Sequence, residues 1–216
     1  MTQILLVRHA VNDFVKTGRL AGWTPEVHLN DDGIAQAVAL GERLRETRIH
    51  AIYSSPLERT IETAEAIAAH HPALEIRHEP GIGEVRYGDW QGQSIAALRM
   101  RKMWQVVQET PSRAVFPNGE AMREVQARAV STIERLVIAH PRETIVIVSH
   151  ADIIKMVVAH YMGAHLDMFQ RFDIAPASIS IISLGFNRPF VVTVNDTAHI
   201  QQMERERKAE KKQSAQ

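Results

Sequence analysis

The stretch ILLVRHA at residues 4–10 places four apolar residues directly before an arginine and a histidine. A second stretch, TIVIVSHA at residues 144–151, has the same plan, an apolar run that leads to His150. Short runs of this kind are typical of strands that are buried on both faces of a sheet. Because open α/β folds bind ligands at the carboxyl ends of their parallel strands, we expect His9 and His150 to lie in one site.

The rest of the chain continues the alternation of apolar strands and amphipathic helices. We expect strands at residues 3–7, 50–54, 74–78, 144–149, 178–184 and 190–194, with a hairpin loop at 185–189 between the last two. Spacings of three and four residues predict helices over 31–46, with Ile34, Val38, Gly41 and Leu44 on one face, and over 120–140, with Met122, Val125, Ala129, Ile133 and Leu136. This pattern predicts an α/β fold, a mostly parallel central sheet with helices on both faces.

The predicted fold occupies residues 1–200 as a single catalytic domain. Residues 201–216 are rich in charge and almost free of apolar side chains, so we expect a disordered or frayed helical tail there. A homodimer through the exposed edge of the last strand is an open possibility, although no residue requires one.

Composition excludes several classes of function. The 25 basic and 25 acidic residues balance, so bulk charge favours neither a nucleic acid nor an anionic membrane as partner. The chain has no cysteine, which excludes disulfides and thiolate catalysis and suits a reducing compartment. No apolar run reaches the roughly 18 residues of a membrane helix, and the N-terminal run is too short for a signal peptide. We therefore expect a cytoplasmic protein without a membrane partner.

The segment SSPLER at residues 54–59 marks a third junction between a strand and a helix. Ser55 is the expected helix cap, Pro56 the first helical residue, and Glu58 the partner that closes a capping box. Arg59 then lies in the first helical turn, where the macrodipole disfavours a cation. An anion bound at the helix mouth would favour an arginine at this position.

Two arginines and two histidines should converge at the edge of the sheet. Guanidinium groups match the oxygens of a dianionic phosphate, and imidazole adds a compact donor. The cluster suits a metal poorly, because arginine repels cations and neither histidine has a second ligand at metal-binding spacing. The predicted ligand is therefore a phosphate group, and we expect neither a metal nor a cofactor.

These motifs resemble those of the histidine phosphatase superfamily, which includes the cofactor-dependent phosphoglycerate mutases and many small-molecule phosphatases. The matching pieces occur in family order: LVRH at 6–9, SSPLERT at 54–60, ETA at 62–64, GE at 83–84, YGDWQG at 87–92 and VSH at 148–150. One arginine-histidine pair carries little information, whereas several ordered motifs are specific. The resemblance implies the phosphoglycerate mutase-like fold and a phosphohistidine intermediate.

The resemblance also implies a role for each motif. His9 would attack phosphorus, and Arg8, Arg59 and His150 would hold the phosphoryl oxygens. Glu84 would protonate the leaving oxygen and then accept a proton from water. The alternative for Glu84 is an ion pair with the neighbouring Arg86.

Arg19 and Tyr87 are weaker candidates for substrate binding. Arg19 matches a family position that contacts phosphate or substrate, and Tyr87 either lines the pocket or fills core space. Two positions depart from the family pattern, because Ala10 replaces a glycine and Val15 replaces an asparagine. Ala10 is tolerated if its φ is negative. Asn12 and Lys16 are the alternatives for the lost phosphate ligand.

The predicted function is the hydrolysis of small-molecule phosphate monoesters without a metal. Phosphoglycerate mutases carry a longer insertion between the positions of Glu84 and His150, so water should reach the phosphohistidine here. Two alternatives stay open: a cofactor-dependent phosphoglycerate mutase, and an inactive family member that only binds a phosphorylated ligand. The natural substrate is not predicted, since pocket walls and loops determine it.

Overall fold

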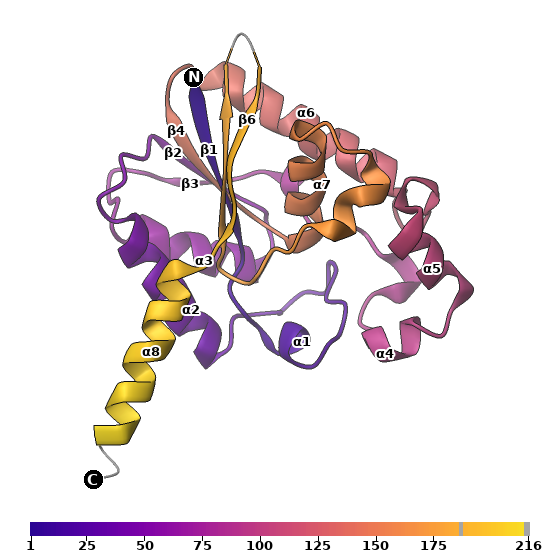
Figure 1. The fold of residues 1–216 in the computed structure, drawn as a ribbon, viewed down its shortest axis with the longest axis horizontal. Helices are drawn as coiled ribbons and strands as arrows, with labels where there is room; N and C mark the ends of the chain where they lie inside the picture. Colours follow the sequence, from indigo (N-terminus) through magenta and orange to yellow (C-terminus); the bar gives the residue numbers. More distant parts are fainter. Residues whose placement is uncertain (186–187, 214–216) are drawn as a thin grey trace.

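A single six-stranded sheet forms the centre of the computed structural model, which describes residues 1–185 and 188–213 (Figure 1). Its strands are β1 (Thr2–Arg8), β2 (Ala51–Ser54), β3 (Ile76–His78), β4 (Thr144–Ser149), β5 (Ile179–Leu184) and β6 (Phe190–Asp196), in the order β3-β2-β4-β1-β5-β6. The first four are parallel, and β5 and β6 are antiparallel additions. The predicted mostly parallel α/β fold is confirmed. Residues 186 and 187 of the expected hairpin loop lie outside the described residues.

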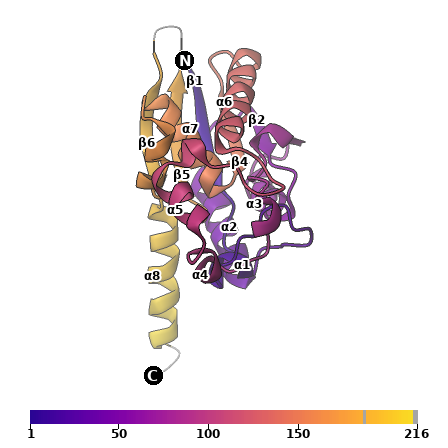
Figure 2. The same ribbon diagram turned by 90° about the vertical axis from the view of Figure 1, so that its right-hand side faces the viewer.

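Helices cover both faces of this sheet, as Figures 1 and 2 show. One apolar core lies between the sheet and α2 (Asp31–Leu44), α3 (Glu58–Ala68) and α8 (Ala198–Gln213). The other lies under α5 (Lys102–Glu109), α6 (Met122–Ala139) and α7 (Ala151–Tyr161). Strand β1 serves both cores, because successive side chains point to opposite faces. The shorter elements are α1 (Asp13–Lys16), α4 (Ile95–Leu98), η1 (Pro80–Ile82), η2 (Gly88–Trp90), η3 (Pro111–Arg113) and η4 (Leu166–Arg171).

The predicted buried face is correct for α6 but only partly correct for α2. All five residues predicted for the buried face of α6 are buried. On α2 the prediction is wrong for Ile34 and Val38, which are 54% and 60% exposed. The prediction is confirmed for Gly41 and Leu44, which are buried, and a Cβ on Gly41 would lie only 2.3 Å from the carbonyl oxygen of Ala66. Close approach to α3 therefore outweighs the burial of the larger side chains.

The start of α3 also differs from the predicted capping box. The helix begins at Glu58, and its cap residue, Leu57, makes no side-chain hydrogen bond. The predicted cap, Ser55, is wrong, because its hydroxyl is 2.8 Å from Nε2 of His150. The turn after β2 thus places a hydroxyl against the second histidine.

The C-terminal segment is a regular helix as far as Gln213, and residues 214–216 lie outside the described residues. Helix α8 is anchored by buried Ile200 and by an ion pair of 2.9 Å between Arg207 and Asp32, and its last turns extend past the body of the molecule (Figure 2). Of the helices in residues 1–185 and 188–213, none is apolar enough over sufficient length to span a bilayer. The assignment of residues 1–200 to one catalytic domain stays a prediction.

Candidate active site

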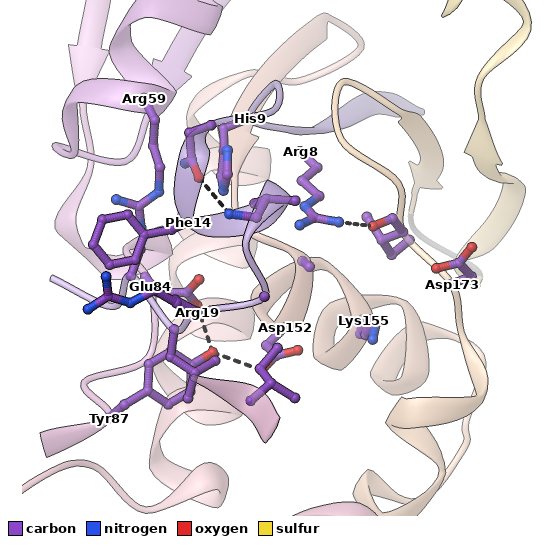
Figure 3. A pocket seen from close by; sticks show the side chains of 18 residues that line it. Arg8, His9, Phe14, Arg19, Arg59, Glu84, Tyr87, Asp152, Lys155 and Asp173 are labelled. Carbon is purple, nitrogen blue, oxygen red and sulfur yellow. Dashed lines mark hydrogen bonds between the residues drawn. The ribbon is translucent and has the colours of Figure 1, made fainter. Parts of the chain in front are cut away.

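The three predicted junctions meet at the carboxyl edge of the sheet, around a cavity of about 260 Å³. Its lining includes Arg8 and His9 from the end of β1, Arg59 from the first turn of α3, and Glu84 from the loop after η1 (Figure 3). This is the position where parallel α/β sheets bind their ligands. The structure therefore brings together residues that are up to 166 positions apart in the chain, from Arg8 to Ile174.

His9 is buried and its proton position follows from one contact. Its Nδ1 lies 2.7 Å from the carbonyl oxygen of Ala10. A carbonyl only accepts, so Nδ1 carries the hydrogen and Nε2 keeps its lone pair. Burial lowers the pKa of His9 well below its usual value, and the cations Arg59 and Arg8 lower it further. His9 is thus held neutral with Nε2 available as a nucleophile.

Arg8 and Arg59 each use only part of their donor capacity. Arg8 Nη1 donates to the carbonyl of Ile174 at 2.6 Å, and Arg59 Nη2 donates to that of Gly22 at 2.8 Å. Within residues 1–185 and 188–213, Nε of Arg8 and both Nε and Nη1 of Arg59 are buried without a hydrogen-bond partner. Buried donors are normally paired, so such a group of unpaired N–H groups indicates a binding site for an anion.

His150 lies behind His9 and is completely buried. The ring centroids of the two histidines are 5.3 Å apart. Its Nδ1 is 3.4 Å from Arg59 Nη2, which can only donate, so in the neutral ring Nε2 carries the hydrogen and donates to Ser55. Burial, followed by the charge of Arg59, lowers the pKa of His150 well below its usual value. His150 does not line the cavity, and its contact with a phosphoryl group stays a prediction.

Glu84 faces the same cavity with a carboxyl group suited to proton transfer. Its Oε1 accepts a hydrogen bond of 2.9 Å from the Val85 amide, and its Oε2 is 3.7 Å from His150 Nδ1. Burial, followed by the charge of Asp152, raises the pKa of Glu84 to about 7. A carboxyl group with a pKa near neutrality can act as acid and as base in one cycle. The alternative ion pair is wrong, because Arg86 stacks over the ring of Trp23 at 4.0 Å.

Arg128 positions Glu84, and sequence reasoning missed it. From α6 its guanidinium donates to the carbonyl oxygens of Gly81, Gly83 and Glu84 at 2.9–3.0 Å. Glu120 pairs with it at 2.9 Å, so the charge is compensated. An arginine in the middle of an amphipathic helix has no local pattern that distinguishes it from a solvated one. Only η1 and the loop after it, once folded, supply the carbonyl groups that identify its role.

The two departures from the family pattern have simple structural outcomes. Ala10 has no positive φ, so its methyl group is tolerated. Val15 contributes an apolar wall to the cavity. Lys16 is wrong as a replacement ligand, since it is not among the residues that line the cavity and pairs with Asp32 at 3.2 Å. Asn12 lies in the cavity, completely buried, and its Nδ2 has no hydrogen-bond partner among the residues that the structure describes.

Replacing Asn12 by serine is expected to weaken inhibition by vanadate about tenfold or more, since a hydrogen bond to a charged group contributes about 1.5–3 kcal/mol. Asn12 caps α1 through its Oδ1, which accepts from the Val15 amide at 2.9 Å. Serine retains a capping oxygen and loses the Nδ2 donor. The measurement is the inhibition constant of vanadate together with the melting temperature. Unchanged inhibition at unchanged stability would exclude Asn12 as an anion ligand.

The two weaker candidates both lie at the cavity. Arg19 is exposed, and its Nε and Nη2 donate to the carbonyl of Gly92 at 3.0 and 2.8 Å. Tyr87 packs its ring against Phe116, and its hydroxyl donates to Asp152 at 2.9 Å (Figure 3). Tyr87 therefore fills core space with its ring and reaches the cavity with its hydroxyl. Their roles in substrate binding stay predictions.

The chemistry of the donor set favours an anion over a cation. Within residues 1–185 and 188–213, no group of three or more histidine or acidic side chains is arranged to hold a metal ion. The unpaired groups at the cavity are N–H donors of Arg8, Asn12 and Arg59. These groups match phosphoryl oxygens and repel a cation.

Fold and site together define an α/β protein that binds a phosphate group beside a neutral histidine at the edge of its sheet. The chain belongs to the histidine phosphatase superfamily (branch 1), whose profile matches residues 4–197. It is 30% identical over 205 residues to phosphoserine phosphatase 1 of Hydrogenobacter thermophilus, a match that covers 93% of this chain and 95% of the relative.

Two further comparisons agree with this family. The chain is 26% identical to the metal-independent phosphoserine phosphatase of Arabidopsis thaliana, over 93% of this chain and 84% of that protein. The solved structure of Bacillus stearothermophilus YhfR superimposes with a TM-score of 0.87 at 27% identity, over 93% of this chain and 100% of that one. The protein is accordingly a phosphoric monoester hydrolase of the histidine phosphatase type, acting through a phosphohistidine.

Proposed function

We propose that this phosphatase hydrolyses compact phosphate esters that carry a carboxylate, of the phosphoserine class, without a metal. The observation that carries the proposal is Lys155 of α7, which lines the cavity. Its Nζ donates to the side chain of Gln170 at 3.1 Å, and it forms no ion pair within the described part of the chain. A cation without a counter-charge beside the phosphate site favours a second anionic group on the substrate.

The opposite charge is also present on the cavity wall. Asp173 lines the cavity and is exposed at its rim (Figure 3). An ammonium group on the substrate would pair with this carboxylate, while the carboxylate of the substrate pairs with Lys155. The names of the two phosphoserine phosphatases that this chain matches support the same class of substrate.

The proposed reaction has two displacements. Nε2 of His9 forms a bond to phosphorus while the bond to the leaving oxygen breaks, and Glu84 gives that oxygen a proton. Glu84 then takes a proton from a water molecule as its oxygen attacks phosphorus and the bond to His9 breaks. Arg8 and Arg59, with His150 behind them, would stabilise the charge on the phosphoryl oxygens in both steps.

The acidic wall argues against the mutase alternative. A phosphoglycerate mutase must hold a bisphosphate, so a second dianion would lie near Asp152 and Asp173, which both line the cavity. Like charges at short range oppose such a ligand. The inactive alternative is also disfavoured, since His9 keeps a free nitrogen and Glu84 a carboxyl group with a pKa near 7.

Replacing Lys155 by methionine is expected to lower kcat/KM for phosphoserine about tenfold, because one charge-assisted hydrogen bond is lost. The loss should appear in KM. Phosphoethanolamine, which lacks the carboxylate, and p-nitrophenyl phosphate should change less than about twofold, within the range of a surface substitution. Steady-state kinetics on the three substrates provides the measurement.

The matched control is Lys16→Met, which removes the same charge from a lysine paired with Asp32 outside the cavity. This variant should behave as the wild type on all three substrates. An equal loss for every substrate in Lys155→Met would contradict recognition of a carboxylate. A wild-type preference for phosphoethanolamine would contradict the proposed class itself.

Two further expectations complete the proposal. A cytoplasmic location suits a chain of 216 residues without cysteine, and fractionation of the source cells tests it. A homodimer would use strand β6, which forms one edge of the sheet and exposes Phe190 and Val192. Sedimentation at several protein concentrations distinguishes that dimer from a monomer.

A further inference from the structure

Three side chains from different elements form a continuous polar array on one side of the cavity. The Tyr87 hydroxyl is 2.9 Å from Oδ2 of Asp152 and 3.4 Å from Oε1 of Glu84. Figure 3 shows the phenol between the two carboxyl groups. Asp152 is the second residue of α7, whereas Glu84 follows η1, so the array exists only in the folded chain.

The number of hydrogens in this array limits its charge. A phenol carries one hydrogen, so two ionised carboxylates would compete for it. One contact would then be a hydrogen bond, and the other would place two oxygen lone pairs against each other. A proton on either acid removes this conflict and also the repulsion between two neighbouring negative charges.

Geometry indicates which acid keeps the negative charge. Asp152 has the shorter contact with Tyr87 and lies in the first turn of α7, where the helix dipole stabilises an anion. Glu84 is more distant from the phenol, and its side chain is only 12% exposed. Both differences favour the charge on Asp152 and the proton on Glu84.

The other charged groups around Glu84 act in the opposite direction. The cations Arg8 from β1 and Arg59 from α3 favour its ionised form, as does the amide hydrogen bond from Val85. Arg128 from α6 donates to the backbone carbonyl of Glu84, and His150 lies 3.7 Å from Oε2. Asp152 is the neighbouring carboxylate that opposes these cations, and burial acts in the same direction. The raised pKa of Glu84, which burial and then Asp152 cause, agrees with this balance.

We propose that Asp152, bridged by Tyr87, keeps a proton on Glu84 before each turnover, so that both act as positioning residues for the general acid. The inference rests on the proposed role of Glu84. It assigns to Asp152 a function that does not require contact with the substrate. The charge of Asp152 thus keeps Glu84 protonated, although the two arginines that face the same site favour its ionised form.

The test is the pH dependence of kcat/KM in the Asp152→Asn variant. With glycerol phosphate, which carries no ammonium group, wild-type kcat/KM should fall as pH rises through about 7, because protonated Glu84 is lost. Asparagine still accepts from Tyr87 but removes the negative charge. The pH above which kcat/KM falls should therefore decrease by about one unit, as expected when a neighbouring like charge is removed. This alkaline decline of kcat/KM is called the basic limb of the profile. With p-nitrophenyl phosphate, whose leaving group needs no proton, no limb should move.

The matched control is Asp173→Asn, which removes a carboxylate from the same cavity wall and should leave the basic limb in place. An unshifted limb in Asp152→Asn would overturn the inference and leave the phosphatase intact. An equal loss for both substrates at every pH would also overturn it, since that is the result of a structural role.

A measurement on the wild-type protein covers the case in which Asp152→Asn fails to fold. The ¹³C signal of the Glu84 carboxyl carbon, assigned by its disappearance in Glu84→Gln, should titrate near pH 7. A titration in the range of ordinary carboxyl groups would overturn the inference. The proposed function would fail separately, if Glu84→Gln slowed alkyl and aryl esters equally.

Discussion

Replacing His9 by asparagine is expected to reduce phosphatase turnover by about 10⁴-fold or more, the scale of losing a nucleophile. Asparagine is the informative substitution, because its side-chain amide can donate to the Ala10 carbonyl as Nδ1 does now. What the variant lacks is the lone pair at Nε2. The cavity and its unpaired donors on Arg8 and Arg59 remain, so vanadate should still bind.

Turnover of p-nitrophenyl phosphate and vanadate binding measure the two effects separately. The control is His78→Asn, at an exposed histidine at the end of β3, which should keep wild-type activity. Substantial turnover in His9→Asn would mean that another group attacks phosphorus. Loss of both turnover and vanadate binding would indicate a collapsed site instead of a missing nucleophile.

Replacing Glu84 by glutamine is expected to lower kcat/KM for alkyl phosphates by about 10²–10⁴-fold, the range of general acid catalysis. An alkoxide leaves poorly without a proton, whereas p-nitrophenolate leaves as an anion. The aryl ester should therefore lose far less. Glutamine can still accept from the Val85 amide, so the geometry of the loop is retained.

The pH profile gives this prediction a second readout. In the wild type, kcat/KM for an alkyl phosphate should decline as pH rises through about 7, where Glu84 loses its proton. In Glu84→Gln that decline should disappear along with most of the rate. The exposed Glu75→Gln variant serves as control and should retain both. Equal slowing of alkyl and aryl esters would contradict the assignment of Glu84 as the acid.

The sequence predicts those parts of the molecule that local patterns determine. The runs at residues 4–7 and 145–148 are apolar at every position, which is the pattern of central parallel strands, and both form such strands. Helix α6 follows its spacing, since a single apolar stripe faces the core. Helix α2 follows its spacing only in part, because Gly41 and Leu44 are buried at the contact with α3 whereas Ile34 and Val38 are exposed.

The residues of the candidate site also separate into those that a local pattern predicts and those that only tertiary packing determines. Arg8, His9 and Arg59 are each recognisable from a motif next to a strand end, and the fold brings them together. Arg128 has no such motif. Asp152 follows His150 by two residues, but its contact with Tyr87 is not predicted, because the path of the loop that carries Tyr87 depends on tertiary packing. The hydroxyl of Ser55 was assigned to a helix end by sequence pattern, yet it binds His150. Local capping rules do not include a competing partner 95 positions away.

The central claim is that His9 carries the phosphoryl group during catalysis without a metal. The direct test is rapid mixing of the enzyme with ³²P-labelled phosphoserine in excess EDTA, followed by an alkaline quench that preserves phosphohistidine. Label should appear on the wild-type protein within one turnover, should be released by acid, and should map to His9. The His9→Asn protein should carry none. Turnover in EDTA without labelled protein, or equal labelling of His9→Asn, would contradict the account.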